Sequence, residues 1–372
     1  SCLGDEDRLR LEQHRISALL TIGGWQKIAA SVDAILLLHS KVDRLATEHS
    51  ALELIAIEST MLASMDFHET IARASRCAQS SNADDLHRAT AARLGARAAS
   101  NVADAESLAA FGSLASKLDR TKPAVLAQLL AVETVFHTDI GSIEHAIRVS
   151  SELVEIERSA GAIRGLIRAL RYRAIPLRIT SSFDEAIAVA GESFDLAVRH
   201  RIAEDAAAGA DLLATILFEA GDLKSARIWL EHAEPWVKRV SASYARTSAN
   251  ATRAMIALEA GDVDEAAAHT PLDVEAISKD PVVRHRMFHL SIAARILLAR
   301  KELISLGKCA TELRQALEQA RPFRRNEYFI ASLALVALAI DSADAARRVV
   351  SDFSESRRND RLVPWRELAL FR

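Results

Sequence analysis

The hexapeptide Gly221-Asp222-Leu223-Lys224-Ser225-Ala226 recurs, with variations, at a fixed interval along the chain. Related hexapeptides begin at Gly141, Ser181 and Gly261, so that neighbouring copies lie 40 residues apart. Each copy has a small residue, a polar residue, an apolar residue, two polar or charged residues and then Ala. The glycine suits the left-handed backbone that ends a helix, and the Asp or Ser after it can cap the next helix. The motif therefore predicts a tight turn between two helices.

The residues on both sides of these turns have helical periodicity. Apolar residues before Gly221 fall on one stripe, and those after Ser182 recur mostly every three or four positions: Leu212, Leu213, Ile216, Leu217 and Ala220, then Phe183, Ala186, Ile187, Ala190, Phe194, Ala197 and Val198. A helical hairpin of this size cannot bury its apolar face alone, so neighbouring hairpins must stack. The sequence predicts an all-α fold, an α-solenoid of about nine helix-turn-helix repeats with a period of 40.

Weaker copies of the turn extend the array toward both ends, near Gly23, Met65, Asn101, Lys301 and Asp341. We therefore expect a single superhelical domain over residues 1–372. Its repeats are degenerate over 1–120, clearest over 121–280, and degenerate again over 281–372, where a C-terminal cap follows. Trp365 is the candidate to pack the last helix as part of that cap.

Three prolines predict local irregularities in the array, because proline disrupts a helix interior. Pro235 should bend or end the second helix of its hairpin. Pro271 and Pro281 should bracket a shortened second helix in the next hairpin.

Composition excludes several classes of function. The chain has 372 residues, of which 50% are hydrophobic, and its net charge is -3. It has no positive excess to attract a phosphate backbone, so direct nucleic-acid binding is not expected. The longest wholly apolar run, Leu333 to Ile340, is far shorter than the roughly 20 residues of a membrane span. No membrane span is predicted.

The three cysteines, Cys2, Cys77 and Cys309, lie far apart and form no CxxC motif. This spacing argues against a disulfide framework and a zinc site, and favours a reducing, cytoplasmic location. The start Ser1-Cys2-Leu3-Gly4 has no initiator Met, which indicates a trimmed chain or a segment of a longer one. A lipoprotein adaptor processed near Cys2 is an alternative that an upstream signal would establish.

The repeat resembles that of the tetratricopeptide-repeat (TPR) superfamily. Its pattern of small and large residues is matched at Ala214, Leu217, Gly221, Leu223, Ala226, Leu230 and Ala233, and the resemblance is clear over residues 125–275. The period of 40 exceeds the usual length of about 34, and the Trp-Leu-Gly-Tyr signature is missing. Such degenerate repeats are similar to those of large bacterial transcriptional regulators, including the maltose-activator type. HEAT-like hairpins, which share the period, remain the alternative fold.

The densest unusual feature is a run of arginines before the Ser181 turn. Arg164, Arg168 and Arg171 follow i, i+4, i+7 spacing, which places three guanidinium groups on one helical face. If the geometry of the resembled family applies, Arg168, Arg171 and Arg178 line a concave groove, where Arg pairs well with carboxylates or phosphates. The simpler interpretation is a solvated face neutralised by acidic neighbours, namely Glu155, Glu157 or Glu185.

The same alignment with the resembled family implies four further groove positions, at Asp211, Thr215, Met255 and Arg295. The expected occupant of this mixed groove is a protein segment or a small-molecule effector. The chain would then act as a non-catalytic scaffold or sensor within a larger bacterial transcriptional regulator. A structural adaptor that self-associates through the ends of the solenoid is the alternative.

No motif indicates catalysis, a cofactor or a metal. The chain has no GxxxxGK[ST], GxGxxG or GxSxG sequence. His285 and His289 have the i, i+4 spacing of helical metal ligands, but Arg286 stands where an HExxH motif has its Glu. No third ligand is indicated, so we expect no metal site there.

Overall fold

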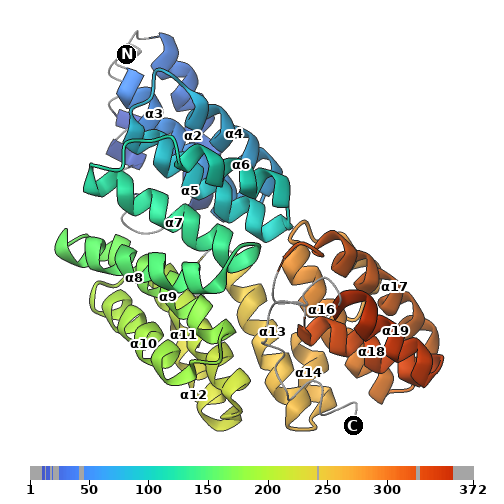
Figure 1. The fold of residues 1–372 in the computed structure, drawn as a ribbon. Coiled ribbons are helices and arrows are strands. Elements are labelled where there is room, and N and C mark those ends of the chain that lie inside the picture. Colours follow the sequence, from blue (N-terminus) through green and yellow to red (C-terminus); the bar gives the residue numbers. More distant parts are fainter. Residues whose placement is uncertain are drawn as a thin grey trace.

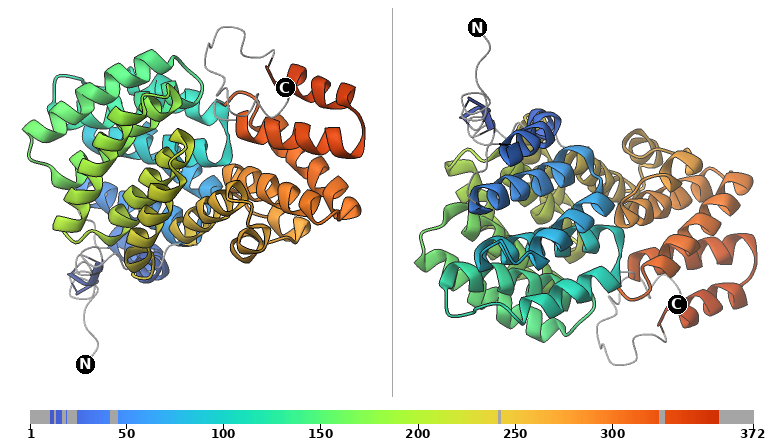
Figure 2. Two further views of the ribbon diagram at one scale, coloured as in Figure 1. Left: turned by 90° about the horizontal axis from the view of Figure 1, so that it is seen from below. Right: turned by 90° about the horizontal axis from the view of Figure 1, so that it is seen from above.

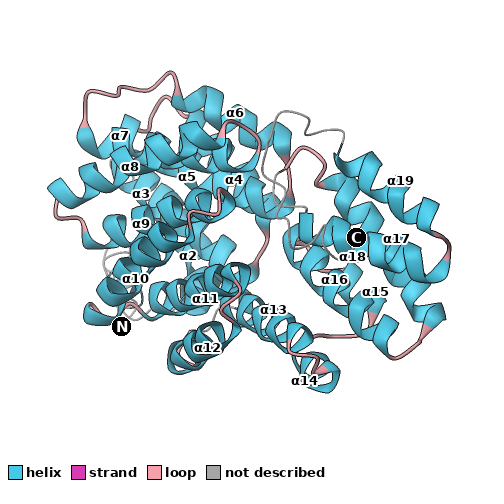
Figure 3. Ribbon diagram, turned by 60° about the horizontal axis from the view of Figure 1, so that its bottom comes forward, coloured by secondary structure: helices cyan, strands magenta, loops and turns pink. Residues whose placement is uncertain are grey.

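The computed structural model describes residues 11–12, 14–16, 19, 25–41, 46–240, 243–323 and 327–354. All regular secondary structure in these ranges is helical (Figure 3). The first part contains α2 (Trp25–Lys41), α3 (Ala46–Ser59), the π-helical turn η1 (Thr60–Ser64), α4 (Phe67–Gln79), α5 (Asp85–Val102) and α6 (Ala105–Ala115). The middle contains α7 (Pro123–Asp139), α8 (Ile143–Ser159), α9 (Ile163–Ile179), α10 (Phe183–Arg199), α11 (Ala203–Ala220) and α12 (Leu223–Val237). The last part contains α13 (Ser243–Glu259), α14 (Val263–His269), α15 (Val274–Ser278), α16 (Val283–Ala299), α17 (Leu303–Gln319), α18 (Glu327–Ile340) and α19 (Ala343–Ser354).

The predicted helical hairpins are confirmed, because each predicted turn from Met65 to Asp341 joins two described helices. The first predicted turn, at Gly23 and Gly24, lies outside the described residues. Gly221 and Gly261 end α11 and α13 with left-handed backbones, at φ of 92° and 82°. The next residue caps the following helix: Asp222 accepts a hydrogen bond from the Ser225 amide and Asp262 from the Glu265 amide.

The three prolines act at the predicted places. Helix α12 runs through Pro235 and ends two residues later at Val237. Between Pro271 and Pro281 the chain forms only the five-residue helix α15, and the preceding helix α14 has seven residues. The hairpin that begins with α13 thus has a short, broken second helix, as the sequence predicts. Trp365 lies outside the described residues, so its capping role stays a prediction.

The hairpins stack into a superhelix with two layers (Figure 1). The first helices of successive hairpins, α5, α7, α9, α11, α13, α16 and α18, contact one another and form the inner layer. The second helices pack against them from outside. Large side chains such as Leu94, Leu129 and Ile167 are fully buried between the layers, together with many alanines. The small side chains of these buried alanines allow the two layers to approach as closely as the repeat requires.

The superhelix closes on itself, because α16 contacts α5. Both views of Figure 2 show the orange and red C-terminal hairpins beside the teal helices of the N-terminal part. Arg284 donates a 3.2 Å hydrogen bond to the Ser100 hydroxyl, and Gln319 donates one of 3.4 Å to the Val102 carbonyl. Val282 and Phe323 pack in the core cluster of the N-terminal hairpins. We call this contact between α5 and the α16–α17 hairpin the seam.

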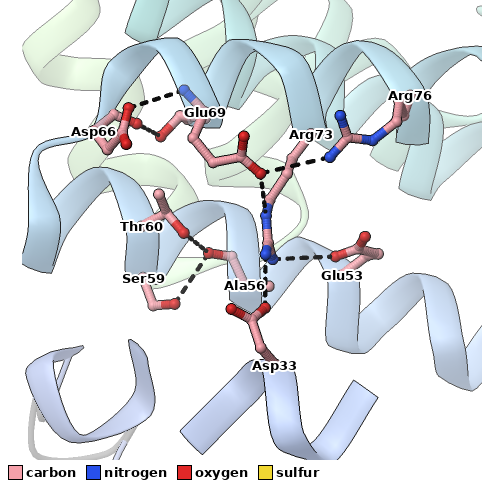
Figure 4. A network of polar contacts seen from close by, with 10 residues as sticks. Asp33, Glu53, Ala56, Ser59, Thr60, Asp66, Glu69, Arg73 and Arg76 are labelled. Carbon is pink, nitrogen blue, oxygen red and sulfur yellow. Dashed lines mark hydrogen bonds and ion pairs between the residues drawn. The ribbon is translucent and has the colours of Figure 1, made fainter. Parts of the chain in front are cut away.

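Arg73 joins the first described helices (Figure 4). Its guanidinium group lies 2.7 Å from Asp33 on α2, 2.9 Å from Glu69 on α4 and 3.7 Å from Glu53 on α3. The Arg73 side chain is only 16% exposed, whereas Asp33 is 67% and Glu69 43% exposed, so water screens these ion pairs in part. One cation therefore holds three consecutive helices together.

None of the described helices combines the length and the apolar character that a membrane crossing requires.

Candidate functional site

The inner-layer helices are joined by a row of polar contacts that includes most of the predicted groove residues. Arg171 on α9 lies 2.7 Å from Asp205 on α11, and Arg178 on α9 lies 2.9 Å from Glu219 at the other end of α11. Farther along the array, Arg295 on α16 lies 2.8 Å from Glu259 on α13. These three predicted arginines thus bridge neighbouring first helices.

Asp211 continues this row between α11 and α13. Its carboxylate accepts hydrogen bonds from the Ser248 hydroxyl at 2.6 Å and from the Thr252 hydroxyl at 3.0 Å. Burial raises the pKa of Asp211, although both hydrogen bonds and the charges of two arginines oppose that rise. Thr215 donates to the backbone carbonyl of Asp211 at 2.9 Å. Asp211 and Thr215 are thereby held in fixed positions.

The other predicted residues have different surroundings. Arg164 is exposed near the start of α9, whereas Arg168 on the same helix is partly buried. Met255 is only 4% exposed and packs in the core of the hairpins around α11 and α13. The structure therefore separates Arg164 and Met255 from the polar row, and their contact with a ligand stays a prediction.

Two of the three acidic neighbours named from the sequence pair with arginines other than the predicted groove residues. Glu185 lies 2.6 Å from Arg173, and Glu155 lies 3.0 Å from Arg158. Glu157 is buried and its carboxylate covers Gly165, where a Cβ atom would lie 2.0 Å from a carboxylate oxygen. Burial raises the pKa of Glu157. A residue without a side chain at position 165 is what gives Glu157 its place beside α9.

A second basic helix, α5, which the sequence analysis missed, lies within electrostatic range of the arginines of α9. Arg93 and Arg97 on α5 act electrostatically on Tyr172 of α9 together with Arg168 and Arg171. We call Arg93, Arg97, Arg168 and Arg171 around Tyr172 the arginine cluster. It spans three inner-layer helices, because Arg93 Nε donates a 2.7 Å hydrogen bond to Gln128 on the intervening helix α7. Arg93 is only 4% exposed, and burial with the charges of its arginine neighbours lowers its pKa to about 10.

Tyr172 lies within electrostatic range of all four guanidinium groups of the arginine cluster. Its hydroxyl oxygen is buried and has no hydrogen-bond partner among the described residues. Burial acts to raise the pKa of Tyr172, but the four guanidinium groups outweigh burial, so the pKa is lowered. Its ring packs against two core clusters, one on each side of α7. The phenol ring is thus held by packing between inner-layer helices.

The sequence contained one signal for Arg93 and Arg97. The two residues are four positions apart in "RLGAR", which places them on one face of a helix. This stretch lies in the degenerate repeats, where no turn motif fixes which face points inward. The packing of α5 against α7 decides which face of α5 points inward.

No metal site is formed by the described part of the chain, where no group of three or more His, Cys, Asp or Glu side chains is arranged to hold an ion. His285 and His289 are buried on α16, and a nitrogen of His285 lies 3.6 Å from a carboxylate oxygen of Asp280. Burial and the nearby charge of His285 lower the pKa of His289 to about 4. Cys77 and Cys309 are buried free thiols, and Cys2 lies outside the described residues.

Neither protein-family models nor curated protein sequences match the chain. Two solved structures are similar to the chain in fold. The crystal structure of a Rap protein complexed with competence and sporulation factor is 14% identical, with a TM-score of 0.57, over 92% of this chain and 99% of that one. Cut9, from the crystal structure of the APC/C hetero-tetramer Cut9-Hcn1, is 12% identical with a TM-score of 0.56.

The match to the Cut9-Hcn1 structure covers 91% of this chain but only 58% of that chain. At these identities the likeness concerns the fold alone. It agrees with the repeat read from the sequence: the chain has an all-helical solenoid fold, as these two structures do.

Proposed function

We propose that residues 1–372 form one superhelical domain that binds a protein segment or a small effector on its inner face, without catalysing a reaction. The observation that carries this proposal is the row of charged and polar side chains on the inner layer, from Arg171 and Asp205 to Glu259 and Arg295. The arginine side chains of these pairs are only 18% and 19% exposed, and the cost of removing such charges from water largely cancels their attraction, so a fold that needed only stacking would not require them. A peptide offers backbone and side-chain groups that such a surface can hydrogen-bond.

The structural likeness supports a binding role by analogy. The Rap protein, matched over nearly its whole length, was crystallised in complex with competence and sporulation factor. We further propose that this chain is the sensor segment of a larger bacterial transcriptional regulator in the cytoplasm. This part of the proposal rests on the resemblance of the degenerate 40-residue repeats.

A selection from a displayed library of random peptides tests the proposal. Selected peptides should bind the purified chain in fluorescence polarisation, and an Arg171→Ala/Arg178→Ala variant should bind them at least tenfold more weakly. Arg158→Ala is the matched control, because Arg158 pairs with Glu155 and Glu192 on the outer helices α8 and α10. Equal loss in the control, or selected peptides that ignore the inner-face variant, would refute binding on the inner face.

Self-association is a second candidate, favoured by apolar side chains exposed at the start of α17. Leu303 is 59% exposed and Ile304 is 82% exposed. Adjacent exposed apolar residues of this size are typical of contact surfaces. Light scattering should then show oligomers that grow with concentration and are lost in Leu303→Ser/Ile304→Ser. A monomer at all concentrations would exclude this candidate.

A further inference from the structure

The arginine cluster differs from the other partly buried arginines of the inner layer in its shortage of acceptors. Arg178, Arg253 and Arg295 each have a carboxylate within ion-pair distance. Arg97 and Arg168 have no hydrogen bond or ion pair among the described residues, although Arg168 lies within electrostatic range of Glu157. Two guanidinium groups within electrostatic range of Tyr172 therefore have donors to spare.

The surroundings of Arg97 and Arg168 carry two energetic penalties that a bound anion would relieve. Arg93 is buried within electrostatic range of both, and its repulsion from these two partly buried charges is stronger than it would be in water. The Tyr172 hydroxyl is also buried without a partner, and an unsatisfied buried hydroxyl costs stability. An acceptor with negative charge would relieve both penalties at once.

We propose that the arginine cluster is an oxyanion site that binds a carboxylate or phosphate group of the ligand held on the inner face. The inference rests on the proposed binding function of that face and assigns the chemistry of one end of the ligand. Arg97 and Arg168 supply planar pairs of N–H donors, which match two oxygens of such a group. Tyr172 donates its hydroxyl hydrogen to the same group.

The remaining residues position these donors. Gln128 holds Arg93 at 2.7 Å, and Asp205 holds Arg171 at 2.7 Å, so both cations contribute charge from fixed places. Gly165 leaves the space in which Glu157 lies. Three carboxylates, those of Glu157, Asp205 and Glu58, act on the four guanidinium groups and do not outnumber them. The net field at the centre of the cluster stays positive.

The test measures anion binding by the full chain at constant ionic strength, with inorganic phosphate and succinate as separate probes and chloride as the balancing salt. A bound anion should raise the melting temperature and should raise the pKa of Tyr172, because it screens the guanidinium charges. Ultraviolet difference spectroscopy follows tyrosinate formation, and Tyr172→Phe identifies the signal among the three tyrosines.

Arg97→Gln/Arg168→Gln should weaken the binding of the probe at least tenfold and remove the shift in the Tyr172 signal. Arg97→Lys/Arg168→Lys keeps the charge but loses the paired donors, so it should bind with intermediate affinity and guards against a folding defect. Arg199→Gln, an exposed site on the outer helix α10, should match the wild type.

A response to phosphate alone assigns a phosphate-bearing ligand, and a response to succinate alone assigns a carboxylate. A response to neither probe, or an equal response in the double Gln variant, overturns the oxyanion site. Peptides that bind the wild type and this variant equally would overturn the inference while leaving the proposed function in place. Anion binding without any selected peptide would instead refute the peptide-binding function.

Discussion

Removal of the Arg284 side chain should open the seam. Arg284 lies 3.7 Å from the carboxylate of Asp139, whose side chain is only 2% exposed, and it also donates to Ser100. Breaking a fully buried ion pair costs about 3–5 kcal/mol. Arg284 is 24% exposed and its distance to Asp139 exceeds that of a hydrogen bond, so we expect Arg284→Ala to cost about 1–2 kcal/mol.

Hydrogen exchange measures this loss where it occurs. A change of one or two kcal/mol alters an opening equilibrium roughly 5- to 30-fold, so amides at the C-terminal end of α5 and the N-terminal end of α16 should exchange faster by that factor. Arg300→Ala is the matched control: Arg300 follows α16 and lies 3.0 Å from Asp264, which is exposed. That variant should change exchange at the seam by less than twofold. Unchanged exchange at both ends of the seam in Arg284→Ala would refute the assigned role.

Three further outcomes follow from individual side chains. The folded pKa of His289 is lowered to about 4 from 6.5, so its contribution is complete above pH 6.5 and is lost as pH falls toward 4. Urea unfolding should show a loss of about 3 kcal/mol over that range, reduced in His289→Gln. A Cβ atom on Gly95 would lie 2.1 Å from the Phe111 ring, so Gly95→Ala should lower the free energy of unfolding by about 1–3 kcal/mol. Gly191→Ala has open space within 4 Å and should raise the free energy of unfolding by about 0.5–1 kcal/mol. Equal unfolding midpoints for the two variants would contradict this. Burial raises the pKa of Cys77 to about 11 and that of Cys309 to about 12, so mass spectrometry should find both unmodified after a thiol reagent at pH 8 and modified in urea.

The repeat architecture could be predicted because its determinants are local. Gly221 and Asp222 end one helix and begin the next through contacts within a few residues. The same turn forms without glycine at Ser181 and Lys301, which adopt left-handed backbones at φ of 58° and 60°. There the period of 40, and not the residue type, located the turn.

The candidate site was predicted only in part, because its contacts join residues far apart in the chain. The spacing of Arg168 and Arg171 placed them together on a helix, but their partners lie on other hairpins. Asp205 comes from the next hairpin, and Arg93 comes from two hairpins earlier. Helical periodicity specifies a face of one helix, whereas the stacking of three helices decides which faces meet.

The seam also bears on how the chain folds. Most contacts in a solenoid join neighbouring repeats, so folding can begin at several hairpins and spread along the array. The pairs Arg284–Ser100 and Gln319–Val102 instead join residues 184 and 217 positions apart. Contacts of such high sequence separation form slowly, because a long loop must close before they gain any stability. We therefore expect α5 to gain its contacts with α16 only after α16 has been synthesised, and we expect the seam to couple the unfolding of the hairpins that it joins.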